Sequence, residues 1–355
     1  MKSVIKFFLF RIAYYLGFWR LVYLVSSAMT EKKFLVVFTY HRIADSKQTA
    51  GYYLGYDRGL DKEDFKAQIE SIIKYFDIID LDKYIDVLTG EANLKKHSAL
   101  ITFDDADSEF IDHAQPVLEK AGCPSVVFTP TGYIDTDMRF WHLLVSNSFN
   151  KMTSDLWAKI GNDTDNVPEK IKVLLQRELP IDERGKAGLC QNIVNELNNY
   201  KHPIIDDIVD RFEKATGKEY DLGIRCLSWD DHRTLAGQGV RFESHGVSHN
   251  KLEELEPTEV EKEFIESKHE LEKQLDTTVT SICYPAGSFN DSVVEQARKA
   301  GYEIGFTTQP GISDYPLSGS DLYTLPRLSI YGDDKYEINF YLGKILIKMV
   351  LHGRI

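Results

Sequence analysis

The stretch SALITFDDADSEF, residues 98–110, decides the fold of this chain. Its apolar first part, residues 99–103, is short and rich in residues that favour strands, which is typical of a buried strand. Two aspartates, Asp104 and Asp105, follow this strand directly. Because buried charge is costly without a partner, paired carboxylates at the end of a buried strand indicate a functional site.

Segments of strand character alternate with segments of helical spacing along the chain. We expect strands at 33–43, 77–81, 98–103, 124–134, 239–246, 279–287 and 302–308, and helices at 61–76, 110–122, 257–275 and 291–301. This alternation predicts a parallel sheet with crossover helices. The expected α/β fold is a distorted or incomplete (β/α) barrel of about seven parallel strands, with a doubly wound open sheet as the alternative. In both folds the chemistry lies at the carboxyl ends of the strands.

Three parts of the chain depart from this alternation. Residues 140–225 are charged and helical in pattern, and we expect them to be a helical insertion in a barrel spanning 31–335; the insertion either caps the site or decorates the surface. Residues 1–30 are apolar and basic, and two arginines interrupt the apolar run. This favours a helix on a membrane surface over a signal, an anchor or a helix packed on the domain. The amphipathic segment 336–355 has the same character.

Composition limits the class of protein. Of the 355 residues, 43% are hydrophobic, which allows a sizeable core, and the formal net charge of -13 argues against nucleic acid as a partner. The four cysteines form no CxxC pair and are typical of core residues in a reducing compartment. The pI near 5.3 and the lack of a clean signal peptide favour a cytoplasmic protein, peripheral at the inner face of the membrane. An exported or anchored protein is the alternative.

A second stretch, FESHGVSHNKL at 242–252, offers two histidines after an expected strand. His245 and His249 stand four apart, so both imidazoles face one way if the loop turns into a helix there. Two histidines and one carboxylate form a facial metal site with open positions. Two adjacent aspartates then divide naturally: one binds the metal and the other acts as a base on the water that the metal activates.

The ordered motifs TFDDA, SHGVSH and YPAG resemble those of the polysaccharide deacetylases, the family that shares the chitooligosaccharide-deacetylase homology domain. The resemblance runs from about residue 34 to 330, with 140–225 less well matched. It implies a distorted (β/α) barrel that uses a divalent metal, most often zinc, to remove acetyl groups from amino sugars. The implied substrate is an N-acetylated polysaccharide or glycan, at a membrane surface in the favoured interpretation.

Carried over by position, the resemblance assigns roles to the motif residues. Asp104 would be the general base, and the metal ligands would be Asp105, His245 and His249. The third motif, with Tyr284 and Pro285, would place a backbone N–H near Tyr284 against the oxyanion.

The chain departs from the family pattern in three places. Ala106 replaces a glycine, which is tolerable unless the backbone there needs a positive φ. Cys283 stands two residues before the motif proline, and no arginine that would orient the base is found there. The late Leu-x-x-His motif, which supplies the acid, is missing; its place holds Arg327, which either orients Asp104 or is an ordinary strand-end arginine.

The segment TYHRI offers a substitute for the missing acid. His41 follows the first expected strand, and the exopolysaccharide-biosynthesis branch of the family is similar in having Tyr-His near its start, where the histidine can serve as the acid. The alternative is a histidine that packs and hydrogen-bonds beside the site.

Two rival functions stay open on the same scaffold. One is an O-deacetylase or an amidase, and the other is a non-catalytic glycan-binding or assembly protein. The missing arginine and late histidine are the best support for the non-catalytic alternative.

Overall fold

The computed structural model describes residues 17–18, 21, 23–25, 33–45, 59–219, 222–313, 315–317, 319–329, 343 and 347. The expected membrane-surface segments, 1–30 and 336–355, lie almost wholly outside these residues, so that expectation stays a prediction. Among the described residues, no helix combines the length and the apolar character that crossing a membrane requires.

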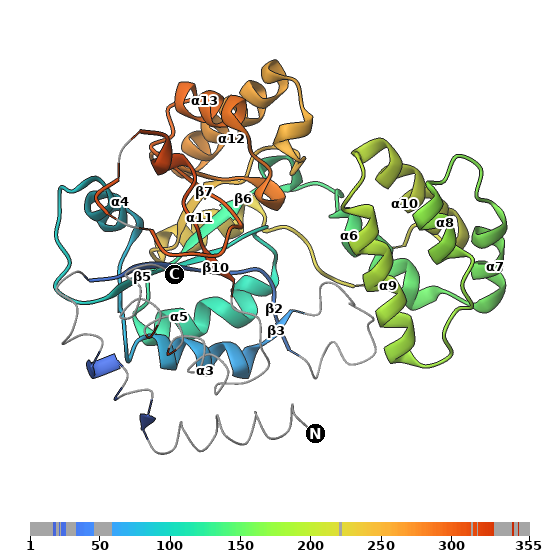
Figure 1. Cartoon of the computed structure of the whole chain (residues 1–355), viewed down its shortest axis with the longest axis horizontal. Helices are drawn as coiled ribbons and strands as arrows, with labels where there is room; N and C mark the ends of the chain where they lie inside the picture. The colour runs from blue at the N-terminus through green and yellow to red at the C-terminus, as the bar shows by residue number, and fades with distance from the viewer. Residues whose placement is uncertain are drawn as a thin grey trace. The chain divides into compact units, whose positions relative to one another are not determined.

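Parallel strands form the central sheet (Figure 1). Its described strands run in the order β10-β1-β5-β6-β7-β8-β9, and β4 pairs with the start of β5 off this path. Their bounds are β1 Leu35–Tyr40, β4 Asp77–Ile78, β5 Ser98–Phe103, β6 Val126–Thr129, β7 Arg241–Ser244, β8 Ser281–Cys283, β9 Ile304–Phe306 and β10 Leu328–Ser329. Two further strands, β2 Ile43–Ala44 and β3 Leu60–Asp61, form a separate two-stranded sheet.

The sheet curves so that its two edge strands, β9 and β10, come together. The short segment just before β10 bonds to β9. The Leu325 N–H donates to the Gly305 carbonyl at 2.8 Å, and the Thr307 N–H donates to the Leu325 carbonyl at 2.9 Å. Three residues later, β10 pairs with β1. Because this seam rests on one bridge and a two-residue ladder, the barrel is distorted and incompletely hydrogen-bonded, which confirms the expected fold class.

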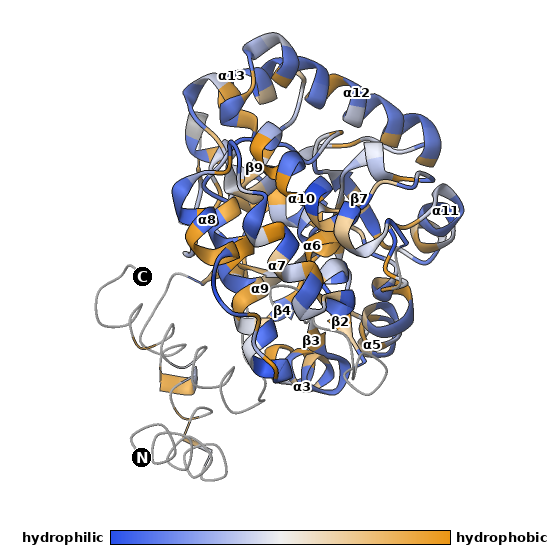
Figure 2. Cartoon of the chain, turned by 90° about the vertical axis from the view of Figure 1, so that its right-hand side faces the viewer, coloured by the Kyte–Doolittle hydropathy of each residue, from blue (hydrophilic) through white to orange (hydrophobic). Residues whose placement is uncertain are grey.

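Helices cover the outside of this sheet (Figure 1). They are α3 Lys62–Ile72, α4 Leu81–Thr89, α5 Gln115–Ala121, α11 Trp229–Gly237, α12 Pro257–Leu275 and α13 Asp291–Lys299. Of these, α3, α5, α12 and α13 stand where helices are expected. The expected strand at 77–81 is shorter than predicted, because the Asp80 carboxylate caps α4 by accepting from the Lys83 N–H. Figure 2 shows α12 largely hydrophilic, as suits a helix that buries only a narrow stripe, including Val260, Phe264 and Leu271.

A second compact unit comprises the described residues among 44–59 and 136–226. Its described helices are α6 Trp141–Lys151, α7 Ser154–Asn162, α8 Glu169–Leu175, α9 Glu183–Leu197 and α10 His202–Thr216. They enclose a hydrophobic core of their own, in which Phe149, Trp157 and Phe212 contact one another. The helical character expected at 140–225 therefore has its own packing, and whether this unit caps the site stays a prediction.

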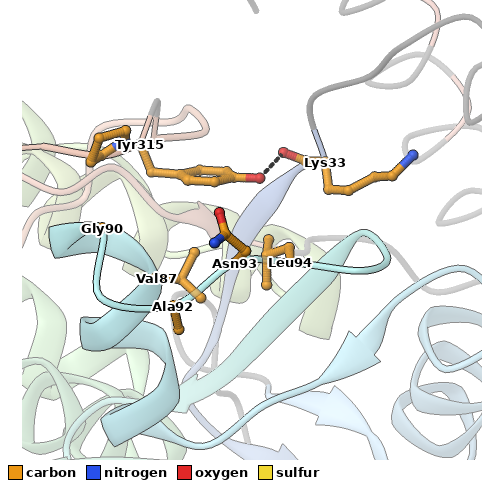
Figure 3. A pocket seen from close by; sticks show the side chains of 8 residues that line it. Lys33, Val87, Gly90, Ala92, Asn93, Leu94 and Tyr315 are labelled. Atoms are coloured by element: carbon orange, nitrogen blue, oxygen red, sulfur yellow. Dashed lines mark hydrogen bonds between the residues drawn. The ribbon is translucent and has the colours of Figure 1, made fainter.

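A pocket of about 490 Å³ lies beside the start of β1, at the opposite end of the strands from Asp104. Lys33, Asn93, Leu94 and Tyr315 line part of it, and the Tyr315 hydroxyl donates to the Lys33 carbonyl at 2.7 Å (Figure 3). This pocket is therefore separate from the candidate site.

Candidate active site

The carboxyl ends of the parallel strands bring the expected site residues to one end of the barrel. His41 follows β1, the Asp104–Asp105 pair follows β5, and His245 follows β7. Arg327 lies just before β10, in the segment that closes the barrel. In-register pairing of β1 with β5 over six residues sets His41 level with Asp104.

The three expected metal ligands converge. Asp105 Oδ1 lies 3.2 Å from His249 Nε2 and 3.6 Å from His245 Nε2. One ligand atom from each residue lies within 4.8 Å of the other two. Two imidazole nitrogens and a carboxylate oxygen at such separations fit a divalent cation of the zinc type, with open positions for other ligands.

A backbone contact fixes which ring nitrogen of His245 carries the proton. Its Nδ1 lies 2.6 Å from the Cys283 carbonyl, which can only accept, so Nδ1 carries the proton and Nε2 presents its lone pair toward Asp105. Burial lowers the pKa of His245 to about 4, which keeps the ring neutral at physiological pH. A neutral imidazole with its second nitrogen held by a carbonyl is the form that binds metals.

His249 reaches the group through a loop, without the helical turn considered above. No helix begins between 245 and 251; Gly246 has φ 75° and His249 has φ 57°, so both are left-handed. The i, i+4 spacing therefore brings the imidazoles together through a tight loop, with ring centroids 5.0 Å apart. Left-handed backbone at a residue other than glycine is costly and persists where surrounding contacts impose it.

Asp104 is held by a buried guanidinium. Arg327 Nη1 donates to Oδ1 at 2.8 Å and Nη2 donates to Oδ2 at 2.7 Å, and both side chains are almost fully buried. Burial alone would raise the pKa of Asp104, but the charge and hydrogen bonds of Arg327 lower it to about 2. The carboxylate is therefore ionised at neutral pH.

The remaining contacts of Arg327 distinguish it from an ordinary strand-end arginine. Its Nε donates to the Thr307 carbonyl at 3.0 Å, its Nη2 lies 3.0 Å from Cys283 Sγ, and its guanidinium lies over the Phe128 ring at 5.7 Å. A guanidinium this fully engaged has one orientation, so the carboxylate that it binds also has one. Of the two roles considered for Arg327, the geometry supports orienting Asp104.

The backbone after β5 turns through two left-handed residues. Asp105 has φ 72° and Ala106 has φ 51°. Replacement of glycine by Ala106 was expected to be tolerable only if this backbone avoids a positive φ, and that condition is not met. The Leu227 N–H donates to the Ala106 carbonyl at 2.8 Å and helps to hold the turn. The strained turn directs Asp104 toward Arg327 and Asp105 toward the histidines.

His41 lies beside Asp104 at the open end of the barrel. Its Nε2 is 3.8 Å from Asp104 Oδ2, and its side chain is 45% exposed. This places an imidazole within reach of both Asp104 and solvent, which an acid serving a leaving group needs. Its catalytic role stays a proposal.

The oxyanion donor expected near Tyr284 stays a prediction, and the structure shows that it is neither the Tyr284 nor the Pro285 amide. The Tyr284 N–H donates to the Phe306 carbonyl at 3.1 Å and so belongs to the barrel ladder, and Pro285 has no N–H. The Tyr284 ring is fully buried and stacks on Phe289. These two residues therefore shape the third motif, whereas neither of their own amides is available to an oxyanion.

Sequence reasoning missed three contributors to this site. The Cys283 thiol lies 3.7 Å from Asp104 Oδ2, where the sequence had only suggested a missing arginine. The Arg42–Glu109 ion pair, at 2.7 Å, ties the end of β1 to the loop after Asp104. Glu263 on α12 binds the loop that carries His249. The three contacts do not show in the sequence, because only the fold creates them; Cys283 stands beside the third motif, but its contact with Asp104 cannot be inferred from there.

This strand-end site on a parallel barrel defines the class of protein. The model of the polysaccharide deacetylase family matches residues 91–305, and the chain belongs to that family. With the poly-β-1,6-N-acetyl-D-glucosamine N-deacetylase of Staphylococcus epidermidis it shares 22% identity over 320 residues, which is 85% of this chain and 81% of that protein. A Bacillus subtilis protein named for a polysaccharide deacetylase, YxkH, is 30% identical over 104 residues; the match spans 29% of this chain and about a third, 36%, of that relative.

Solved structures show the same fold at low identity. IcaB from Ammonifex degensii superposes with a TM-score of 0.56 at 15% identity, covering 88% of this chain and 98% of that one. The deacetylase PplD of Streptococcus pyogenes, solved with acetate, gives a TM-score of 0.53 at 18% identity, covering 88% and 97%.

Proposed function

We propose that this chain is a metal-dependent carbohydrate deacetylase that hydrolyses the N-acetyl group of an amino sugar in a polysaccharide or glycan. The observation that carries the proposal is the division of the aspartate pair. Asp105 faces His245 and His249, while Asp104 is held apart by Arg327. The likeness to an enzyme named for poly-β-1,6-N-acetyl-D-glucosamine supports a β-1,6-linked N-acetylglucosamine polymer as substrate.

In this proposal each residue of the site has one task. Asp105, His245 and His249 would hold the cation, most favourably zinc. When bound, the cation supplies Lewis acidity toward an acyl oxygen and lowers the pKa of water. Asp104 accepts the proton of the attacking water, and Arg327 keeps that carboxylate ionised and oriented. As the bond between the carbonyl carbon and nitrogen breaks, His41 gives a proton to the amine, and acetate and a free amino sugar leave.

Acetate release tests the reaction and its substrate. Purified protein is stripped of metal by chelation, and zinc is then restored in the presence of β-1,6-linked N-acetylglucosamine oligomers, β-1,4-linked oligomers or an O-acetylated sugar. We expect zinc-dependent release from the N-acetylated oligomers, with the β-1,6-linked series preferred. Release from the O-acetylated sugar alone would establish an O-deacetylase, and zinc binding without any release would support a non-catalytic protein.

The acid role of His41 is tested separately. His41→Ala should lower kcat strongly while zinc binding stays unchanged, because His41 is no part of the ligand group. A variant with the kcat of the parent would leave His41 as a packing residue. The inner-face location expected from the sequence is tested by protease treatment of intact cells, and cleavage from outside would refute it.

A further inference from the structure

The loop that carries His249 is bound by a carboxylate from α12. Glu263 Oε2 accepts from the backbone N–H groups of Val247 at 2.7 Å and Ser248 at 2.9 Å, and its Oε1 accepts from the Ser248 hydroxyl at 2.6 Å. We propose that Glu263 is a positioning residue for His249 and thereby sets the affinity of the site for its cation. The inference deepens the proposed function and rests on it.

The loop needs such support because its backbone is strained. Gly246 and His249 are both left-handed, with φ 75° and 57°. On one side, the carbonyls of Gly246 and Val247 accept from the N–H groups of Thr131 and Gly132, at 3.0 and 2.9 Å. On the other side, the Glu263 carboxylate accepts from the N–H groups of Val247 and Ser248, which belong to the same two peptide groups. The peptide groups before His249 are thus held from both sides, which fixes the direction in which its imidazole leaves the loop.

The two loop amides that Glu263 binds are specifically suited to a carboxylate. Two successive backbone N–H groups form a concave, electropositive cradle, and an ionised acceptor forms stronger bonds there than a neutral one. Glutamine has the same size but is neutral and offers one acceptor oxygen, and its NH₂ group fits only if the Ser248 hydroxyl turns from donor to acceptor. The cradle also has no spare room: a Cβ added at Gly246 would lie 3.0 Å from Glu263 Oε2.

Zinc affinity of Glu263→Gln tests the inference. The metal-free full chain is titrated with Zn²⁺ against a chelator, and Co²⁺ absorption reports the coordination geometry. We expect zinc binding to weaken about 10- to 100-fold, as for other residues that support metal ligands, with a changed Co²⁺ spectrum. Glu266→Gln, at an exposed position on the same helix, is the matched control and should bind zinc like the parent.

Ser248→Ala gives a second, milder variant. It removes one of the three bonds, so we expect a smaller loss of zinc affinity, and the double variant should lose less than the product of the two single losses because both remove the same contact. Should Glu263→Gln fail to fold, Ser248→Ala decides the question. Parent-like zinc affinity and Co²⁺ spectrum in the folded variants would overturn the inference alone, whereas a parent protein that binds no zinc would overturn the proposed function and this inference with it.

Discussion

At the scale of the residue, the pairing of Arg327 with Asp104 joins two buried charges. Both groups are buried, so Arg327→Met leaves an uncompensated carboxylate in the barrel. We expect this change to lower the free energy of unfolding by about 3–5 kcal/mol, and by much less when Asp104→Asn is also present. Urea unfolding of the parent, the two single variants and the double variant measures the difference. If Arg327→Met lowered the free energy of unfolding equally in the parent and in Asp104→Asn, a direct pairing would be contradicted.

His232 makes the stability depend on pH. It is fully buried, its Nδ1 donates to the Ser228 carbonyl at 2.8 Å, and its Nε2 accepts from the Thr129 hydroxyl at 3.1 Å, so the ring is neutral. Burial lowers its pKa from 6.5 to about 4. Between these values the unfolded chain binds more protons, so the free energy of unfolding falls as the pH falls from 6.5 to 4, by about 3 kcal/mol for this group.

Urea unfolding at a series of pH values tests this dependence. His97 and His245, whose pKa values burial also lowers to about 4, act in the same direction. The His232→Gln variant should therefore keep part of the pH dependence of its free energy of unfolding. The slope of that free energy against pH should become smaller by the equivalent of up to one proton. A variant with the same slope as the parent would show that His232 is not the neutral, buried group described here.

Sequence motifs named the candidate site residues, Arg327 included, but left the role of Arg327 open between orienting Asp104 and an ordinary strand-end arginine. Asp105, His245 and His249 lie together as expected because the segments that carry them follow the carboxyl ends of β5 and β7 in a parallel barrel. The partner of Asp104 lies 223 residues away in the chain, and only closure of the barrel brings it there. The strain at Ala106 was likewise invisible, since a sequence does not show the sign of φ.

At the scale of the element, the seam of the barrel depends on a glycine in β9. A Cβ at Gly305 would lie 2.6 Å from Tyr284 Oη and 2.8 Å from the Tyr323 carbonyl. We expect Gly305→Ala to cost about 1–3 kcal/mol of unfolding free energy through overpacking. Gly237→Ala, at the end of α11, is the control; its Cβ would meet nothing within 4 Å, so it should be neutral or slightly stabilising. Similar unfolding midpoints for the two variants would refute the tight seam.

The predictability of each element follows its length. Strands such as β5 and helices such as α12 lie where their periodicity places them. The two-residue strand β10 carries too few residues for a periodic signal, and pairing with β1 creates it, whereas β4 was expected but is shorter than predicted. Helix α4 was missed because the apolar stretch before it was assigned to a longer strand; the Asp80 cap and Gly90, at φ 90°, set its ends.

At the scale of the whole molecule, the two compact units should respond differently to metal. The ligand group lies in the barrel unit, and the helical unit has a separate core. Zinc at 100 times its dissociation constant should stabilise the barrel by about 2.7 kcal/mol through mass action. Hydrogen exchange with and without zinc should therefore slow in β5 and β7 and stay unchanged in α9 and α10. Equal slowing in both units would show that they unfold together.

The central claim is that two adjacent aspartates have separate tasks, and one comparison tests it directly. Zinc content and acetate release are measured for the parent, Asp104→Asn and Asp105→Asn. Because Asp104 is bound by Arg327 and Asp105 faces the histidines, Asp104→Asn should hold zinc like the parent yet release no acetate, while Asp105→Asn should lose both. Loss of zinc from Asp104→Asn, or acetate release that persists in it, would contradict the account.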